Sequence, residues 1–482
     1  MNYAIVTRVL GKLFSIEALL MIPSLIAAIV YKDQKDIMSF VYTMLILLVV
    51  GSLMSLVKPE DKRLHAREGM VIVTVGWIMV SFFGSLPFVF SGSIPSVTNA
   101  FFESVSGFTT TGATILNDVE AMPKGNLFWR AFTNWIGGMG ILVFTLALLP
   151  AMGISGLQIY KAETTGPVTD KIMPKMRDTA RMLYITYGVF SLLPLVLLLL
   201  GGMSFYDACV HTFGTVGTGG FSSRQASVGA YDSTYIHMVI GVFMMFSGVN
   251  FSLYYALYKN KWRDVIKDQE LRLYLFIVLG STLLVAADLF LRNTSGLGLS
   301  LRDAYFQVSS IITTTGYTTV DYDQWSTFSK LILLALMFIG GCAGSTAGGI
   351  KNIRILVLLK LVKREISKIF HPRAVIPVKV GDKTVPEDTL LGITAFTFLY
   401  VLVFLAGTLI VSTQGVSFLT AVSSVASAIG NIGPGMDAVG PSFSYSVYND
   451  FNKWVLSLLM LLGRLELFTM IGVIVPGKWR NE

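Results

Sequence analysis

The chain has 482 residues, of which 53% are hydrophobic and only 14% charged, and its mean hydropathy is +0.66. A soluble protein carries about a quarter charged residues, so this composition excludes a soluble protein and predicts a polytopic membrane protein. Two cysteines in apolar stretches, Cys209 and Cys342, exclude a disulfide framework, and the four scattered histidines lack the spacing of a metal site.

The first predicted element is a hairpin of two transmembrane segments in residues 1–66. Its apolar segments run from about residue 13 to 30 and from about 38 to 57, and polar residues separate them. The first segment lacks a small-residue cleavage pattern and is long enough to span a bilayer, which argues against a signal peptide. We expect this hairpin to precede the main body of the fold.

The rest of the chain is predicted to form four repeats, each a span, a re-entrant helix, a loop and a second span. The re-entrant segments are too short to cross a bilayer. With the hairpin, this pattern predicts an all-α integral membrane fold with ten spans and four re-entrant pore helices. The expected repeats cover residues 67–155, 156–265, 266–370 and 371–482.

Each repeat contains a short loop built on a glycine, and we name these loops L1 (110–112), L2 (218–220), L3 (314–316) and L4 (431–433). The threonines before the glycine in L1 and L3 resemble the carbonyl-lined filter of potassium channels. At one fixed distance before each glycine stands a residue that can cap a helix, and alanine always follows it: Asn99, Asp207, Asp303 and Thr420. We expect four short capped helices whose carbonyl ends, with roughly half a negative charge, favour a cation.

The charge pattern predicts the orientation of the repeats. Connections between repeats are basic, above all residues 351–388, whereas the segments after L1, L3 and L4 lean acidic. The positive-inside rule then predicts cytoplasmic connections and termini, and L1–L4 on the outer side. This topology explains the net charge of +8, so no nucleic-acid partner is expected. Parallel repeats can close around one pseudo-fourfold axis, whereas glycines that merely pack helices would not explain the capping pattern.

Residues 340–351, here called the Gly-rich segment, fall where the second span of the third repeat should pass its midpoint. Each glycine costs about 1 kcal/mol relative to alanine in a helix, so we expect the helix to break here. Unpaired backbone at membrane depth must border protein or water, which favours a loop that lines a cavity beneath L1–L4. A tightly packed unbroken helix is the alternative.

Arg464 is predicted to lie near the middle of the last span, where a charge costs several kcal/mol unless it faces water or a partner. Glu466 lies two positions further along, on another side of the helix, and is a poor partner for Arg464. Two readings stay open. The arginine either faces the cavity or is satisfied by main-chain carbonyls at a contact between helices.

Taken together, the four loops, the leading hairpin and the Gly-rich segment make the chain resemble the TrkH-type potassium uptake proteins. That superfamily also includes KtrB and the plant HKT transporters, and the hairpin favours the TrkH type. The resemblance implies a pseudo-fourfold pore within each subunit and a homodimer in the cytoplasmic (inner) membrane. It further implies a cytosolic TrkA-like subunit that binds a regulatory nucleotide.

The resemblance also implies roles for individual residues. Potassium is the implied cargo, with no organic cofactor in this chain, and glycine rather than serine in L1 favours potassium over sodium. The Gly-rich segment is the implied gate, through Gly344, Ser345, Thr346, Ala347, Gly348 and Gly349, and Arg464 is an implied electrostatic barrier. The implied ion ligands are the main-chain oxygens of Thr110, Thr111, Gly112, Thr218, Gly219, Gly220, Thr314, Thr315, Gly316, Asn431, Ile432 and Gly433.

The leading functional prediction is therefore channel-like potassium uptake, gated at the Gly-rich segment. The basic connection 351–388 suits contact with a cytosolic partner, and anionic lipid headgroups would suit the same charges. The alternatives are a coupled symporter of potassium with protons or sodium, and a poorly selective cation transporter. An enzyme would need a nucleophile, an acid–base pair or a metal cluster, and the sequence predicts none of these.

Overall fold

The structure is a computed structural model that describes residues 1–59, 65–140, 176–292, 294 and 296–474. Within these residues the fold is helical except for one short antiparallel hairpin of β1 (Lys379–Val380) and β2 (Lys383–Thr384). The predicted helical class is confirmed. The expected boundary between residues 155 and 156 lies outside the described residues, as do most of the basic connection there and the end of the span before it.

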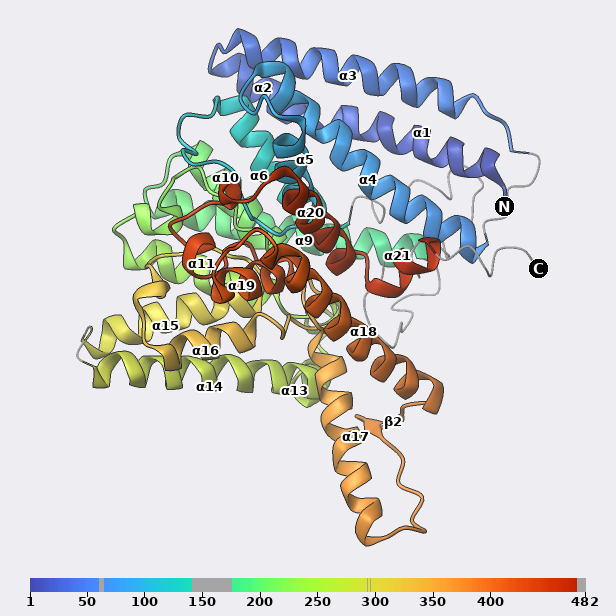
Figure 1. Ribbon diagram of the computed structural model, residues 1–482, viewed down its shortest axis with the longest axis vertical. Coiled ribbons are helices and arrows are strands. Elements are labelled where there is room, and N and C mark those ends of the chain that lie inside the picture. Colours follow the sequence, from blue (N-terminus) through green and yellow to red (C-terminus); the bar gives the residue numbers. More distant parts are fainter. Residues whose placement is uncertain (60–64, 141–175, 293, 295, 475–482) are drawn as a thin grey trace.

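The N-terminal hairpin consists of α1 (Tyr3–Leu20), α2 (Ile22–Val30) and α3 (Gln34–Ser55). The helix begins ten residues earlier than predicted and is interrupted at Met21, just before Pro23. Helices α1 and α3 approach closely, since a methyl group on Gly11 would lie 2.7 Å from the carbonyl oxygen of Gly51. In Figure 1 they lie beside α4 (Ala66–Ser91), along one edge of the molecule.

The remaining helices follow the predicted repeats. The first repeat continues with α5 (Val97–Phe108) and α6 (Lys124–Gly138), and the second holds α9 (Met176–Leu200), α10 (Phe205–Gly217), α11 (Thr234–Ser247), α12 (Phe251–Tyr258) and α13 (Trp262–Lys267). The third holds α14 (Gln269–Leu291), α15 (Leu297–Ile312), α16 (Thr327–Leu336) and α17 (Asn352–Phe370). The fourth holds α18 (Glu387–Ser412), α19 (Phe418–Gly430), α20 (Asp450–Arg464) and α21 (Leu467–Ile474). Short 3-10 turns cover Ser227–Ala230, Tyr322–Gln324, Asp437–Val439 and Tyr445–Val447.

Six helical segments in the described part are long and apolar enough to cross a bilayer: Tyr3–Val30, Gln34–Ser55, Arg67–Ser91, Arg181–Leu200, Gln269–Leu291 and Glu387–Ser412. Two further spans form if bent pairs are joined, α11 with α12 (94°) and α20 with α21 (116°). The remaining two of the ten predicted spans begin as α6 and α16. The description pauses at residue 140 after α6, and the Gly-rich segment interrupts α16, so the count of ten stays a prediction.

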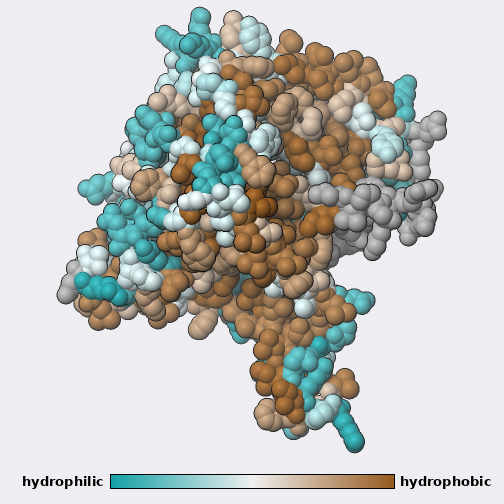
Figure 2. Space-filling view, viewed as in Figure 1, coloured by the Kyte–Doolittle hydropathy of each residue, from teal (hydrophilic) through white to brown (hydrophobic). Residues whose placement is uncertain are grey.

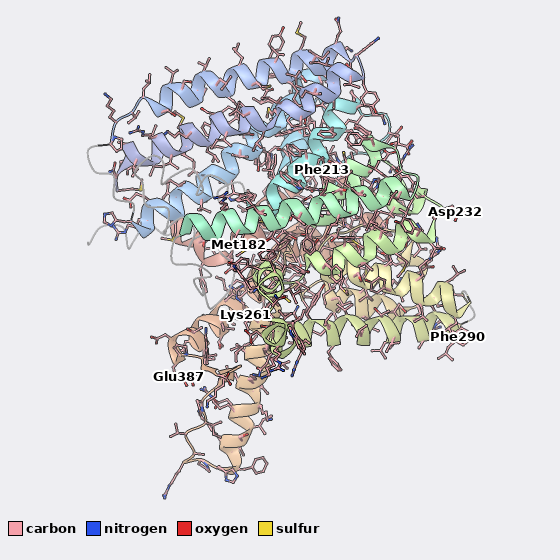
Figure 3. All side chains as sticks on the ribbon, turned by 180° about the vertical axis from the view of Figure 1, so that it is seen from behind. Met182, Phe213, Asp232, Lys261, Phe290 and Glu387 are labelled. Atoms are coloured by element: carbon pink, nitrogen blue, oxygen red, sulfur yellow. The ribbon has the colours of Figure 1, made fainter. Side chains whose placement is uncertain are left out.

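The surface suits a lipid environment. Figure 2 shows a broad hydrophobic surface over the body, with hydrophilic residues gathered toward one side and on the projecting tip. Seen from behind, Asp232 and Phe290 lie at one end of the helices, and Met182, Lys261 and Glu387 lie toward the other (Figure 3). Helix α17 projects from the body together with β1 and β2 (Figure 1).

The four short helices predicted before the loops are present as α5, α10, α15 and α19, but the predicted caps are wrong. Serine hydroxyls cap three of them instead: Ser96, Ser204 and Ser417 accept the main-chain N–H groups of Asn99, Asp207 and Thr420 at 3.4, 3.1 and 3.1 Å. Helix α15 begins after Gly296, so Asp303 lies well inside it. The alanine of each pair is buried, which explains the repeated pattern as packing: Ala100, Ala208, Ala304 and Ala421.

Candidate functional site

Loops L1–L4 follow directly after α5, α10, α15 and α19 and share one backbone conformation. The first residue of each loop is left-handed, with φ of 54° at Thr110, 55° at Thr218 and Thr314, and 56° at Asn431. The central glycine also has positive φ, at 79°, 67°, 80° and 108° in chain order. A β-branched residue in this region is strained by about 1 to 3 kcal/mol, so the surroundings must hold each loop in place.

The central glycines bring the four loops together in a closed cycle. A methyl group on Gly112 would lie 2.1 Å from the carbonyl oxygen of Gly219 in L2. The same hypothetical atom on Gly220, Gly316 and Gly433 would lie 2.0, 2.1 and 2.7 Å from the oxygens of Thr315, Ile432 and Thr111. Each glycine therefore abuts the middle residue of the next loop in chain order, and L4 returns to L1. A side chain larger than hydrogen would push a neighbouring main-chain oxygen away.

The middle residue of each loop is buried, and its N–H group is already used. Thr111, Gly219, Thr315 and Ile432 donate to carbonyls five residues earlier, at 2.8, 2.9, 2.9 and 3.0 Å. Their own main-chain oxygens accept no hydrogen bond from any residue that the structure describes. Buried carbonyls are normally paired, so four unpaired oxygens at equivalent places indicate a site for water or a cation.

Side chains just outside the loops connect neighbouring repeats. The Tyr317 hydroxyl donates to the Phe221 carbonyl at 3.1 Å, joining L3 to L2 as packing of both aromatic residues would suggest. The Tyr322 hydroxyl donates to Gly435 at 2.8 Å, and the Tyr445 N–H donates to Thr114 at 2.8 Å. These contacts tie the third repeat to the fourth and the fourth to the first.

A buried ion pair joins the first repeat to the second. Arg130 Nε donates to Glu103 Oε1 at 2.5 Å, and the two side chains are 3% and 0% exposed. Glu103 also accepts from the Thr114 hydroxyl at 2.8 Å, and the Arg130 guanidinium lies 3.5 Å from the Phe221 ring centre. Sequence reasoning singled out Glu103 but missed Arg130, whose position on α6 facing α5 has no local signal.

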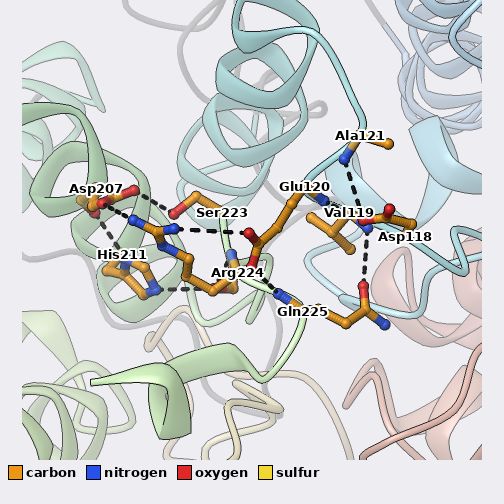
Figure 4. A network of polar contacts seen from close by, with 10 residues as sticks. Asp118, Val119, Glu120, Ala121, Asp207, His211, Ser223, Arg224 and Gln225 are labelled. Atoms are coloured by element: carbon orange, nitrogen blue, oxygen red, sulfur yellow. Dashed lines mark hydrogen bonds and ion pairs between the residues drawn. The ribbon is translucent and has the colours of Figure 1, made fainter. Parts of the chain in front are cut away.

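The outer surface of the second repeat contains a further polar network (Figure 4). The Asp207 carboxylate accepts from the Ser223 hydroxyl at 2.6 Å and pairs with Arg224 at 3.2 Å. His211 contacts the Asp207 carbonyl and the Ser222 hydroxyl through its two ring nitrogens, at 2.8 and 3.0 Å. This network fixes the chain that leaves L2, since Ser222 and Ser223 follow Phe221 directly.

Two aspartates beyond L3 and L4 give a pH-dependent prediction. Burial raises the pKa of Asp323 to about 6, whereas a hydrogen bond from the Ser417 hydroxyl lowers the pKa of Asp437. The folded protein therefore holds the Asp323 proton more tightly than the unfolded chain does. Its contribution to stability is full below the ordinary value of 3.8 and is lost as the pH rises to about 6.

We accordingly expect Asp323→Asn to raise the thermal unfolding temperature in detergent at pH 7 and to leave it unchanged below pH ~4, where Asp323 is protonated in both states. Asp437→Asn serves as the control of opposite sign. Because the pKa of Asp437 is lowered, its contribution is present at neutral pH and is lost on acidification. An Asp323→Asn curve parallel to the wild type at every pH would contradict the prediction.

The Gly-rich segment breaks the helix as predicted, since α16 ends at Leu336 and α17 begins at Asn352. The segment is anchored at its ends by the buried Glu270 carboxylate, whose Oε1 accepts from Ala343 N–H at 2.7 Å and Ile353 N–H at 2.9 Å. The Cys342 N–H donates to the Gly248 carbonyl at 2.8 Å. The segment therefore contacts both the second repeat and the start of α14.

Two other breaks were not predicted. Helix α11 stops at Ser247 and α12 begins at Phe251, and α20 stops at Arg464 before α21. Both lie in the second span of a repeat, as the Gly-rich segment does. The sequence signal was weak, because each break has a single glycine nearby, Gly248 or Gly463, and the chain turns at Glu466 with φ of 61° although it is not glycine.

Arg464 lies at the end of α20, beside such a break, and not at the middle of a continuous helix as predicted. Its guanidinium donates to the Thr346 carbonyl in the Gly-rich segment at 2.8 Å, to Gly138 at 3.0 Å and to Gly137. Both readings of this residue meet here, since main-chain carbonyls satisfy the charge and the segment is its neighbour. The Glu466 carboxylate pairs with Arg354 on α17.

A cavity of about 540 Å³ opens beside these residues. All six residues of the implied gate line it, together with Arg464, Glu270 and Lys351. A methyl group on Gly348 would lie 2.5 Å from the carbonyl oxygen of Gly430, at the end of α19, so the segment reaches the residue just before L4. The cavity and the loop cycle are therefore neighbouring parts of one region.

One buried carboxylate was missed. Glu17 on α1 is 0% exposed, and neither of its oxygens has a hydrogen-bond partner among the described residues. Sequence reasoning found no acid deep in a span, because a single glutamate in an apolar segment gives no sign of which way it faces. Glu17 belongs to the N-terminal hairpin rather than to the loop cycle.

Apolar spans surrounding buried loops with unpaired main-chain oxygens are typical of membrane transport proteins. Comparison with known proteins agrees: residues 36–475 match the family model TrkH, described as cation transport protein. The Trk system potassium uptake protein TrkH of Salmonella typhimurium is 38% identical over 486 residues, and TrkG of Escherichia coli is 35% identical over 480, covering 100% and 99% of each chain. The crystal structure of the potassium transporter TrkH from Vibrio parahaemolyticus matches with a TM-score of 0.89 at 36% identity, over 100% of both chains.

The chain belongs to the TrkH family of cation transport proteins. The resemblance read from the loops, the hairpin and the Gly-rich segment is thereby confirmed.

Proposed function

We propose that this protein takes up potassium across the cytoplasmic membrane through a channel-like pore on the axis of L1–L4. The observation that carries the proposal is the set of four buried, unpaired main-chain oxygens, of Thr111, Gly219, Thr315 and Ile432, in neighbouring loops. Oxygens held in this way can replace the water shell of a cation. The helices α5, α10, α15 and α19 end at these loops and direct their negative ends toward the same place.

In this proposal the four repeats are arranged in parallel around the pore, with both termini in the cytoplasm and the twelve residues of L1–L4 as potassium ligands. Residues 344–349 act as the gate, and Arg464 adds a positive charge that opposes cations in the cavity. The potassium uptake named for the relatives supports the cargo. The family resemblance supports the homodimer and the cytosolic TrkA-like regulatory subunit, for which the basic helix α17 offers a surface.

The proposal is tested by rubidium uptake into liposomes that contain the purified protein. We expect uptake well above that of empty liposomes, and inhibition by potassium more than by sodium or lithium. Uptake no faster than in empty liposomes, with folded protein present, would overturn the proposal.

Coupled symport is a second candidate, because coupled transporters often hold a buried carboxylate and Glu17 is one. Rubidium uptake measured with and without a proton or sodium gradient separates the two. Uptake that requires the gradient, and that Glu17→Gln abolishes, would favour symport.

Deleting residues 344–348 should leave the pore poorly closed. These residues line the cavity, and among them Thr346 and Gly348 contact Arg464 and Thr314. We expect basal rubidium uptake to rise roughly tenfold, since the loss of even a single hydrogen bond from a closed state is worth about 1 kcal/mol. The measurement is uptake without any regulatory subunit. A deletion variant that is folded and as tightly closed as the wild type would remove the gate assignment.

A further inference from the structure

The Gly-rich segment is attached to loop L3 through the side chain of Thr314. The Thr314 hydroxyl accepts the main-chain N–H of Gly348 at 2.6 Å, and the whole of Thr314 is buried. The same residue supplies one of the main-chain oxygens of L3. One residue therefore belongs both to the proposed ion site and to the proposed gate.

The equivalent positions of the other loops provide an internal comparison. Thr110, Thr218 and Asn431 have the same left-handed backbone as Thr314, within two degrees of φ. The Thr218 hydroxyl donates to the Gly217 carbonyl, and the Asn431 amide donates to Thr111 Oγ1 and the Met460 carbonyl. The Thr110 hydroxyl has no hydrogen-bond partner in the part of the chain that the structure describes. Of the four, Thr314 alone hydrogen-bonds the Gly-rich segment within that part.

We propose that Thr314 is a positioning residue that couples the ion site at L3 to closure of the Gly-rich segment. This inference rests on the proposed function. An ion bound at L3 fixes the backbone of Thr314, and the stiff β-branched side chain then holds its hydroxyl toward Gly348. Coupling between two sites is reciprocal, so a closed segment strengthens ion binding and a bound ion stabilises the closed segment.

The other anchors of the segment explain why this contact is the sensitive one. Glu270 holds the two ends of the segment, and Arg464 holds Thr346. Neither anchor touches L3 in the described contacts, so neither transmits the state of that loop directly. The hydrogen bond from Gly348 to Thr314 is the direct route.

A native cysteine reports on opening of the segment. Cys342 is 1% exposed, and its N–H group is bonded to the Gly248 carbonyl, so a charged maleimide can reach it only when the segment opens. Cys209 is removed by Cys209→Ala to leave a single thiol. The rate of maleimide labelling is then measured in liposomes with potassium chloride, and again with choline chloride at equal ionic strength.

In the Cys209→Ala background, we expect potassium to slow labelling roughly tenfold, and equally in Thr110→Val. Thr314→Val should label at the fast rate in both salts, because it leaves the Gly348 N–H without its acceptor and so costs about one hydrogen bond. Thr314→Ser keeps the hydroxyl and should restore most of the potassium effect. Thr110→Val is the matched control, since it removes a hydroxyl from the same backbone position in L1.

Each outcome decides the matter. Equal potassium protection in Thr314→Val and Thr110→Val would overturn the latch. Equal labelling of the parent protein in both salts would also overturn it, and this result needs no Thr314 variant to fold. If the parent protein still takes up rubidium in that case, the proposed function stands and only the coupling fails. If it takes up none, the proposed function fails first.

Discussion

Replacement of Gly316 by serine is expected to lower the preference for potassium over sodium roughly ten- to a hundredfold, or by about 1.4 to 2.8 kcal/mol of differential binding. A Cβ atom at Gly316 would lie 2.1 Å from the carbonyl oxygen of Ile432 and 2.8 Å from Pro434. The serine must therefore displace a proposed ligand of L4, and its own backbone is strained at φ of 80°. The measurement is rubidium uptake with potassium and sodium as competitors.

Gly415 provides the control for backbone strain. Its φ is also 80°, but a Cβ atom there would meet nothing within 4 Å. Gly415→Ser should keep the selectivity of the wild type and match Gly316→Ser only in strain. A competition profile for Gly316→Ser that overlays the wild type would show that L3 and L4 do not choose the ion.

The second large effect is expected at Arg464, where alanine should raise cation uptake roughly tenfold or more. A unit charge at about 8 Å opposes a cation by about 2 kcal/mol at an effective dielectric constant of about 20. Removing the guanidinium also frees Thr346 in the Gly-rich segment from its contact. Both changes act in the same direction. Uptake should be measured per folded protein, with the folded fraction taken from size-exclusion chromatography.

Two further substitutions separate the charge of Arg464 from its hydrogen bonds. Arg464→Lys keeps the charge with fewer donors and should retain most of the barrier, whereas Arg464→Gln keeps a donor without the charge and should behave like alanine. If alanine instead lowers uptake and thermal stability together, the contacts with Gly137 and Gly138 are the main role of this arginine.

The loops and the Gly-rich segment were predictable because glycine is a local signal. Positive φ at Gly112 or Gly344 demands that residue type whatever surrounds it, so the sequence carries the information at one position. The break in the third repeat was legible for the same reason, since its glycines are repeated. Prediction of the all-helical membrane class needed only composition and apolar length.

Other features depend on neighbours that are distant in the chain. The helix caps were misplaced by three residues because serine, aspartate, asparagine and threonine all cap helices, and Ser96 and Asn99 compete on equal terms. The pair of Glu103 and Arg130 depends on how α5 packs against α6. The partners of Arg464 are three carbonyls from two other repeats, and no pattern in its own helix indicates them.

The contact that closes the loop cycle also constrains how the protein is made. Asn431 donates to Thr111 at 3.0 Å, and these residues are 320 positions apart. During synthesis L1 therefore waits beside an empty place until α19 has been inserted, while L2 and L3 already have neighbours. A chain that stops before the fourth repeat exposes two unpaired edges inside the membrane. Such a fragment is a clear target for the membrane proteases that remove incomplete proteins.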